Sequence, residues 1–376
     1  MMQRRLVSMI RKEFRQLLRD WPILFILVWA FSGAIYVAGH AVRIEVSDYP
    51  VVVYDLARGA SSRELVSRLR APHFKVVGFV DSDAALVRSL DAGEASLAVV
   101  IPPDFERMVA EGAGRFQIIV DGTITQSSIM ATSYVAQIAA RMNLELFMAR
   151  LGLVDKDLAR LPQIDARQRV AFNPNVENAW FTSLLEMLNI TTMVATLLTA
   201  AAMVREKVYG TLEQLMVSPL RPLEFFVAKI LPTVIVIVSL SFVSLFGVVQ
   251  GLFGTPIRGS LLLFYSVMAV YVACVSSMGL LVAVFARNLA QAMMMLFLIL
   301  MPMMFLSGAF TPPESMSTWM RYASLISPMR YFMDFGYQVL FKGNGLAYVW
   351  HDILGILVLG SGMFGLSMWG FRRLYN

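Results

Sequence analysis

The sequence predicts an α-helical polytopic membrane protein with six transmembrane helices and an inserted α/β (α+β) extracytoplasmic domain. Of its 376 residues, 57% are hydrophobic and 15% are charged, whereas soluble domains have about 45–50% and about 25%. The mean hydropathy is +0.64. The charges are concentrated, because residues 41–176 hold 15 of the 32 basic and 16 of the 26 acidic residues. These observations indicate a soluble domain inserted into an apolar chain.

The net charge of +6 does not indicate nucleic acid as a partner. Residues 41–176 carry a net charge of −1, so the positive excess lies in the apolar remainder, where it borders the apolar stretches. Such basic borders are typical of membrane proteins. The single cysteine, Cys274, excludes an internal disulfide framework and a cysteine-rich metal site. We expect neither a metal site nor a catalytic centre.

Residues 1–20 are predicted to form an amphipathic helix in the cytoplasmic interface. Apolar residues recur there every three to four positions, and the basic residues lie largely on the other faces. These apolar positions are Leu6, Ile10, Phe14 and Leu17. Residues 21–39 contain no charge and are predicted to be the first transmembrane helix. The alternative is a signal peptide cleaved near Ala41, but the preceding 20 residues are too long for its basic region.

Five further apolar stretches are long enough to cross a membrane, because a hydrocarbon core of about 30 Å needs about 20 residues of helix. They make residues 179–376 a membrane domain, in which Pro302 is expected to kink one helix. The predicted spans are Ala179–Val204, Ile230–Phe253, Leu261–Ala286, Leu289–Phe310 and Trp350–Phe371.

The distribution of arginine and lysine predicts that both termini are cytoplasmic. With the N-terminus inside, the cytoplasmic segments contain 13 basic residues and the short outer loops contain 4. The positive-inside rule favours this orientation, and long translocated domains do not count in it. Residues 41–176 are therefore expected on the outer side.

Residues 41–176 alternate between strand-like and helix-like runs, which predicts a small α/β or α+β domain. Neither a Ser/His/Asp cluster nor a metal-ligand spacing can be assembled from it. We therefore interpret it as a binding or docking domain. Strands are predicted at 50–55, 74–80, 96–101 and 116–121, and helices at 61–69, 83–90, 104–111 and 125–151.

The cytoplasmic segment 205–222 is predicted to contain a short rigid helix just outside the membrane. Gly210 permits a sharp bend, and Thr211 with Gln214 fits the capping box that satisfies backbone donors at a helix start. An apolar stripe follows, and Ser218-Pro219 ends the helix. Such a helix suits a groove on a cytoplasmic partner, although capped loops are also common between ordinary spans.

The string REKVYGTLEQLMVSPLRPLEFFVAKILP, which begins at Arg205, resembles the signature segment of ABC-2 type transporter permeases. Further matches cover nearly the whole chain and are closest to the bacterial drug-export-like subfamily with a large extracytoplasmic domain. They are VVVYDLARGASSRELV, LAVVIPPDFERMV, FQIIVDGT, FNP, FLSGAFTPPESMSTWMRYASLISPMRYF and FKGNG. The chain departs from the family where Tyr337-Gln338-Val339 replaces a usually basic position.

The resemblance implies a dimer of permeases in a bacterial inner membrane, each passing a coupling helix to a separate ATP-binding subunit. The implied partners are two copies of that subunit, a second permease that is identical or a sister chain, membrane lipids and, as a further candidate, a periplasmic adaptor. ATP and Mg²⁺ would be bound by the partner, since the chain contains no G-x-x-x-x-G-K-[ST] loop, and no cofactor of its own is expected. The residues that match the coupling pattern are Arg205, Glu206, Gly210, Thr211, Glu213, Gln214 and Leu215.

Glu186 is the one acid well inside a predicted span, where an ionised carboxylate costs about 2.5–3.5 kcal/mol on insertion scales. It either contacts a cation, a substrate or a proton, or forms a structural hydrogen bond, for example to Asn189. Residues 311–349 are too interrupted to span and are predicted to be an outer re-entrant or interfacial region, which in the family closes the outer end of the pathway. The candidate pathway residues are Glu186, Asn189, Ser307, Gly308, Pro312 and Pro313.

Together these patterns favour the permease subunit of an ABC exporter, which is not itself an enzyme. It is expected to export a small molecule, and hydrophobic drugs are the favoured substrate class. The alternatives are an exporter of lipids or glycans, and a membrane-anchored extracytoplasmic sensor or scaffold. Six spans are more than an anchor needs. A secondary transporter is also disfavoured, because that class usually shows several intramembrane charges and inverted repeats.

Overall fold

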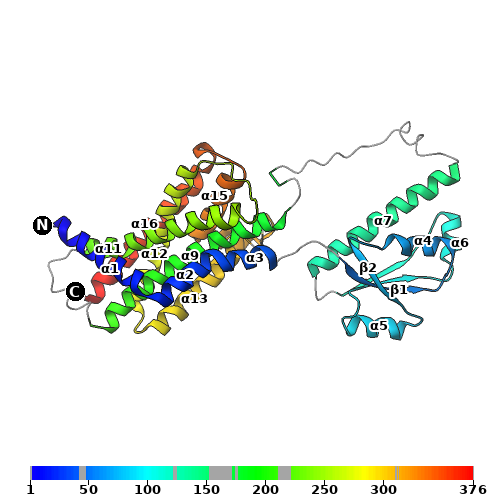
Figure 1. Ribbon diagram of the computed structural model, residues 1–376, viewed down its shortest axis with the longest axis horizontal. Coiled ribbons are helices and arrows are strands. Elements are labelled where there is room, and N and C mark those ends of the chain that lie inside the picture. Colours follow the sequence, from blue (N-terminus) through cyan, green and yellow to red (C-terminus); the bar gives the residue numbers. More distant parts are fainter. Residues whose placement is uncertain are drawn as a thin grey trace. The chain divides into compact units, whose positions relative to one another are not determined.

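The computed structural model describes residues 2–41, 48–121, 125–151, 172–173, 177–210, 222–309, 311 and 313–375. The chain divides into two compact units, the first formed by residues 1–42 and 170–376 and the second by residues 43–169. The first unit is helical, and the second combines a sheet with helices (Figure 1).

Within the described ranges, the first unit contains six helices that are long and apolar enough to cross a membrane, as many as the sequence predicts. The first span runs from Trp21 to His40 through α2 (Trp21–Trp29), the π-helical η1 (Ala30–Ala34) and α3 (Ile35–Ala41). The others are α9 (Asn178–Val208), α11 (Pro222–Ser244) continued by the π-helical η3 (Leu245–Gln250), α12 (Leu261–Phe285), α13 (Leu289–Leu306) and α16 (Leu346–Tyr375).

Four of these helices differ from their predicted bounds by three residues or more. Helix α11 begins at Pro222 rather than at Ile230 and, with η3, ends at Gln250 rather than at Phe253. Helix α16 spans Leu346–Tyr375 rather than Trp350–Phe371. The other two differ at their ends. Helix α9 continues beyond Val204 to Val208, because the charged side chains in its last turn all find partners, as described below. Helix α13 includes Pro302 and ends at Leu306 rather than at Phe310. There the left-handed Gly308 (φ +86°) turns the chain.

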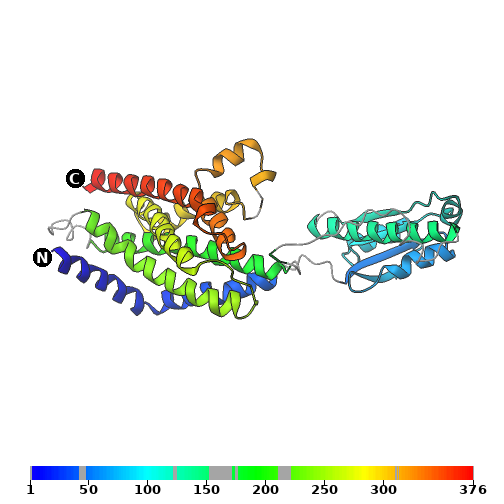
Figure 2. The same cartoon turned by 90° about the horizontal axis from the view of Figure 1, so that it is seen from above.

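Helix α1 (Met2–Arg19) packs against α11 and α2. Its buried residues are Met9, Glu13 and Leu17, so the buried face of this amphipathic helix includes an acid. The two chain ends lie at the same end of the helical bundle (Figure 2), as an even number of spans requires. We call this the terminus-bearing end.

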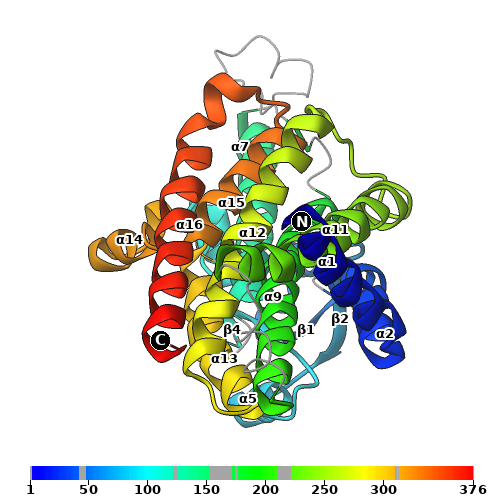
Figure 3. The ribbon, with the colours of Figure 1, turned by 90° about the vertical axis from the view of Figure 1, so that its left-hand side faces the viewer.

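Helix α9 lies at the centre of the bundle and packs against α3, α11, α12 and α13 (Figure 3). Its contact with α12 is polar and close. The hydroxyl oxygens of Thr192 and Tyr271 are 2.8 Å apart, and Gly279 of α12 faces the backbone of Thr196. Small and hydroxylated residues allow membrane helices to approach closely and to hydrogen-bond across the contact.

Between α13 and α16 the chain forms short helical segments instead of a span. They are η4 (Pro313–Ser315), α14 (Thr318–Ser324), α15 (Pro328–Gly336) and the π-helical η5 (Tyr337–Phe341). Phe332 of α15 is buried and stacks on Tyr271, with ring centroids 3.8 Å apart, whereas α14 exposes Trp319. At Tyr337-Gln338-Val339, where the chain departs from the pattern of the family that it resembles, the Gln338 amide donates to Asp352 Oδ2 at 3.1 Å.

The second unit is built on a four-stranded mixed sheet of order β2-β1-β3-β4. Strand β1 is parallel to β2 and β3, and β4 is antiparallel to β3. Helices α4, α6 and α7 cover one face and α5 the other. Every element lies within one residue of its predicted bounds. They are β1 (Tyr49–Asp55), α4 (Ala60–Arg68), β2 (Phe74–Phe79), α5 (Asp83–Asp91), β3 (Leu97–Ile101), α6 (Phe105–Glu111), β4 (Gln117–Val120) and α7 (Thr125–Leu151).

Candidate functional site

Four charged side chains meet at the terminus-bearing end of the first unit. This charge cluster consists of Lys12, Glu13, Glu206 and Lys229. Lys229 Nζ lies 2.7 Å from Glu13 Oε1 and 2.8 Å from Glu206 Oε1. Lys12 Nζ lies 2.8 Å from Glu206 Oε1. The cluster therefore joins α1, α9 and α11, and its formal charges balance.

Three of the four charges are buried. The exposed fraction of the side chain is 1% for Lys229, 5% for Glu206 and 9% for Glu13, against 49% for Lys12. Burial raises the pKa of Glu13, and the Lys229 ammonium opposes this shift. Removing an ion from water is costly unless an opposite charge compensates for it. The ion pairs therefore favour an arrangement of the three helices in which the buried charges stay compensated.

Arg205, the residue before Glu206, reaches the junction of α1 and α2. Its Nη1 lies 3.0 Å from Asp20 Oδ2. Asp20 is the N-cap residue of α2, and its Oδ1 accepts a hydrogen bond from the Ile23 amide at 3.4 Å. The Asp20 carboxylate therefore connects the end of α9 to the start of the first span.

Lys207, the residue after Glu206, reaches the end of α12. Its Nζ donates to the carbonyl oxygens of Val284 at 2.8 Å and Ala286 at 2.9 Å. A cation at this position satisfies carbonyls that have no partner within the helix and interacts favourably with the helix dipole. Three consecutive residues thus tie the end of α9 to different neighbouring helices.

Gly210 follows the end of α9 in the left-handed conformation, with φ +67°, which confirms the predicted bend. Its amide donates to the Lys207 carbonyl at 3.3 Å. A residue with a Cβ is strained at this φ by roughly 1–2 kcal/mol. The capping box and the apolar stripe predicted after Gly210 lie outside the described residues, as do Thr211, Glu213, Gln214 and Leu215.

Glu186 and Asn189 are one turn apart on α9. The Asn189 amide donates to Glu186 Oε2 at 3.4 Å, so the structural hydrogen bond considered above is present. Asn189 is fully buried, whereas Glu186 belongs to a partly exposed stripe on a helix that is otherwise largely buried. The stripe consists of Thr182, Glu186, Met193, Leu197 and Ala201.

The other pathway candidates lie in the turn after α13. Ser307 is buried, and its hydroxyl donates to the Met304 carbonyl at 2.6 Å. Pro313 begins η4 and stands 3.5 Å from where a Cβ on Gly308 would lie. Pro312 lies outside the described residues. These contacts define a tight turn, and the role of the turn in a pathway stays a prediction.

Sequence reasoning identified Arg205 and Glu206 but missed most of their partners. Lys12 and Lys229 entered only the count of basic residues, and Glu13 and Asp20 were not singled out. Two signals were available. Glu13 lies four residues before Leu17 and four after Met9, on the apolar face of α1, and Lys229 interrupts an otherwise apolar run.

Six helices that are long and apolar enough to cross a membrane, with a cluster of buried, paired charges at one end, are the features of an integral membrane protein. The chain belongs to the ABC-2 family of transporter proteins, which it matches over residues 21–369. It is thus the membrane subunit of an ABC transporter, and such permeases pair with an ATP-binding subunit.

Three proteins of Escherichia coli K12 are similar to this chain over nearly their whole length. The inner membrane transport permease YhhJ is 31% identical over 363 residues, which cover 96% of this chain and 95% of that protein. The probable multidrug ABC transporter permease YbhR is 31% identical over 373 residues, 98% of each chain. The probable multidrug ABC transporter permease YbhS is 25% identical over 377 residues, 98% of this chain and 97% of that protein.

Proposed function

We propose that this permease couples ATP hydrolysis by a separate cytoplasmic subunit to the export of small hydrophobic molecules such as drugs. One observation carries the coupling role. Arg205, Glu206 and Lys207 tie α9 to α1, α2, α11 and α12 directly before the bend at Gly210. A displacement of the segment that follows would therefore be passed to α11 through the buried Glu206–Lys229 pair, which resists separation. It would be passed to α1, α2 and α12 through the more exposed ion pairs and the backbone hydrogen bonds of Lys207.

In this proposal the terminus-bearing end faces the cytoplasm of a bacterial cell. The predicted excess of basic residues supports this orientation. The ATP-binding subunit is then contacted by Thr211, Glu213, Gln214 and Leu215. That subunit alone holds ATP and Mg²⁺, and this chain performs no catalysis. Residues 43–169 lie outside, where they gate the pathway or dock a periplasmic adaptor.

The functional assembly would contain two permeases and two ATP-binding subunits, the second permease being an identical or a sister chain. The pathway would run between the permeases along the partly exposed stripe of α9 that contains Glu186. The printed names of YbhR and YbhS support drugs as the substrate class. The apolar exposed surface of α13, which includes Phe297 and Leu298, suits hydrophobic substrates.

The test is to purify this chain from membranes and to identify the ATP-binding subunit that is retained with it. The ATPase rate of that subunit is then measured with and without the permease in lipid vesicles. Stable association with a changed ATPase rate would support the proposal. So would ATP-dependent movement of a hydrophobic dye across the vesicle membrane, away from the side that corresponds to the cytoplasm. A chain that binds no ATPase would contradict it.

Changing Leu215 to aspartate or Glu213 to arginine is expected to uncouple the subunits without unfolding the spans. An unpaired charge placed in an apolar contact costs about 2 kcal/mol or more, so binding of the ATP-binding subunit should weaken about 30-fold or more. The measurement is ATPase stimulation as a function of permease concentration. Glu111→Arg, an exposed charge reversal in the second unit, is the matched control, and equal stimulation by all three variants would refute the coupling role.

Glu186→Gln separates the structural from the functional role of this acid. Glutamine retains an oxygen that accepts the Asn189 hydrogen bond, so thermal stability should change by less than about 1 kcal/mol. If the carboxylate contacts a cationic substrate in the pathway, export of a cationic dye should fall several-fold while a neutral dye is unaffected. If the variant exports both dyes at the wild-type rate, Glu186 has only the structural role that its hydrogen bond to Asn189 provides.

A further inference from the structure

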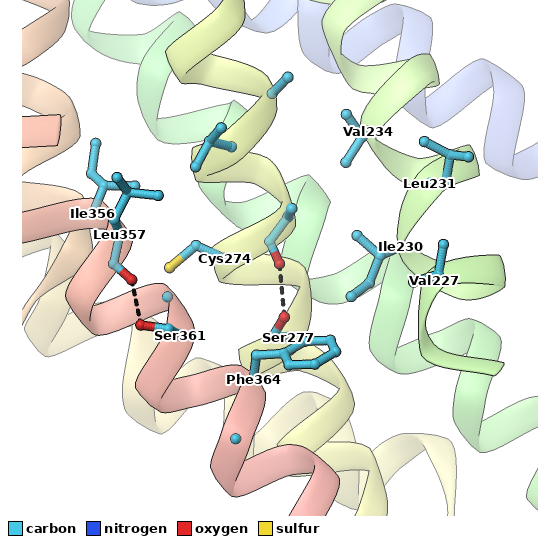
Figure 4. A pocket seen from close by; sticks show the side chains of 15 residues that line it. Val227, Ile230, Leu231, Val234, Cys274, Ser277, Ile356, Leu357, Ser361 and Phe364 are labelled. Atoms are coloured by element: carbon cyan, nitrogen blue, oxygen red, sulfur yellow. Dashed lines mark hydrogen bonds between the residues drawn. The ribbon is translucent and has the colours of Figure 1, made fainter. Parts of the chain in front are cut away.

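A groove between α11, α12 and α16 takes no part in the coupling proposed above. Helix α12 lies between the other two (Figure 3), and α11 and α16 both pack on it. The cavity between them has a volume of about 610 Å³ (Figure 4), within the range of about 300–1,000 Å³ that is usual for small-ligand sites.

The lining of the groove is almost entirely apolar. Its hydroxyl groups are engaged within their own helices, since Ser277 donates to the Ala273 carbonyl at 2.8 Å and Ser361 to the Leu357 carbonyl at 2.6 Å (Figure 4). A polar ligand would lose its hydrogen bonds to water there without replacement. The surface therefore fits a hydrocarbon.

The length of the groove fits one half of a bilayer. Its walls are formed by residues 227–234, 269–277 and 356–365, which at 1.5 Å per residue extend about 10–14 Å along the helices. One half of a hydrocarbon core measures about 15 Å. On α11 the groove begins only five residues after Pro222, whereas on α12 and α16 it lines the middle of each helix. It therefore extends from the half nearer the terminus-bearing end to the middle of the bundle.

An aromatic cluster joins α11 to α16 at that end of the groove. The ring centroids of Phe226 and Phe364 are 5.8 Å apart, and those of Phe226 and Phe371 are 5.5 Å apart. The next two residues, Arg372 and Arg373, are exposed in the last turns of α16, and the Arg373 guanidinium lies 5.3 Å from the Trp369 ring centroid. Two cations therefore lie in the last turns of α16, seven and eight residues beyond Gly365 at that end of the groove.

We propose that the groove binds one acyl chain of an acidic phospholipid from the leaflet at the terminus-bearing end, with its headgroup beside Arg372 and Arg373. The surrounding bilayer supplies this ligand, and basic residues near the surface attract acidic headgroups. The bound chain fills the space between α11 and α16, which contact each other little except through the aromatic cluster. The proposal depends on the membrane location of the chain and not on its substrate.

Filling the groove tests the proposal. Gly365 lines the groove, and a Cβ built on it meets no atom within 4 Å, so Gly365→Trp places a large ring in the cavity without a clash in the backbone. Gly362 is equally open on the same helix but does not line the groove, which makes Gly362→Trp the matched control. The complete permease with its ATP-binding subunit is reconstituted in vesicles of equal parts phosphatidylglycerol and phosphatidylethanolamine. Retained lipid is then counted by native mass spectrometry.

The wild-type chain and Gly362→Trp should each retain one phosphatidylglycerol, and Gly365→Trp should lose it while eluting as the same monodisperse complex. Replacing Arg372 and Arg373 by glutamine should lower the preference for phosphatidylglycerol over phosphatidylethanolamine about fivefold per charge. Arg15→Gln, a charge on α1, should leave that preference unchanged. Any of three results would overturn the proposal. The two tryptophan variants could retain lipid equally, the wild type could retain none, or an exported dye could displace the lipid at equal stoichiometry.

Discussion

Replacing Lys229 by methionine is expected to destabilise the first unit by about 3–5 kcal/mol, because it leaves buried carboxylates without their shared cation. Glu13 and Glu206 both contact Lys229 Nζ within 2.8 Å. The remaining cation, Lys12, is half exposed and contacts Glu206 at hydrogen-bonding distance. The measurement is the thermal unfolding midpoint of the purified chain in detergent, together with its stimulation of the ATP-binding subunit.

Two further variants show whether pairing is the cause. Lys12→Met removes a half-exposed cation of the same cluster and should cost less than about 1 kcal/mol. The double variant Glu13→Leu with Lys229→Met removes one complete pair and retains the contact of Lys12 with Glu206, so it should recover most of the lost stability. If Lys229→Met is as stable as the wild type, the charge cluster does not hold these helices together.

Most of the fold was predictable because it depends on local patterns. Long apolar runs defined the six spans, and alternating strand-like and helix-like runs defined the elements of residues 43–169. The end of α9 was placed too early, at Val204. Three charges in a row predict the end of a span when their partners are unknown, and here Arg205, Glu206 and Lys207 all find partners that let the helix continue.

The candidate site was predictable only in part because it depends on contacts between distant segments. Glu13 and Lys229 are 216 residues apart in the chain, and no local pattern specifies that they meet. Gly210 was predicted correctly, since a glycine after a charged helix end is a common termination signal. The hydrogen bond between Asn189 and Glu186 lies within one helical turn, and it was therefore among the alternatives that the sequence offered.

Replacing Gly279 by alanine is expected to destabilise the contact between α9 and α12 by about 1–3 kcal/mol, the usual cost of overpacking. A Cβ at this position would lie 2.4 Å from the Thr196 carbonyl oxygen and 3.2 Å from its Cα. These are backbone atoms of a buried helix, so the two helices must move apart. The hydrogen bond between Thr192 and Tyr271, which are 2.8 Å apart at their hydroxyl oxygens, would then lengthen.

A matched substitution separates this close approach from the general effect of alanine on a helix. Gly362→Ala adds the same methyl group to α16, where nothing lies within 4 Å, and it should stabilise that helix by roughly 0.5–1 kcal/mol. Thermal unfolding midpoints of the two variants should therefore shift in opposite directions from the wild type. A Gly279→Ala variant that shifts upward together with Gly362→Ala would show that α9 and α12 are not in backbone contact at this point, and the central position of α9 would have to be revised.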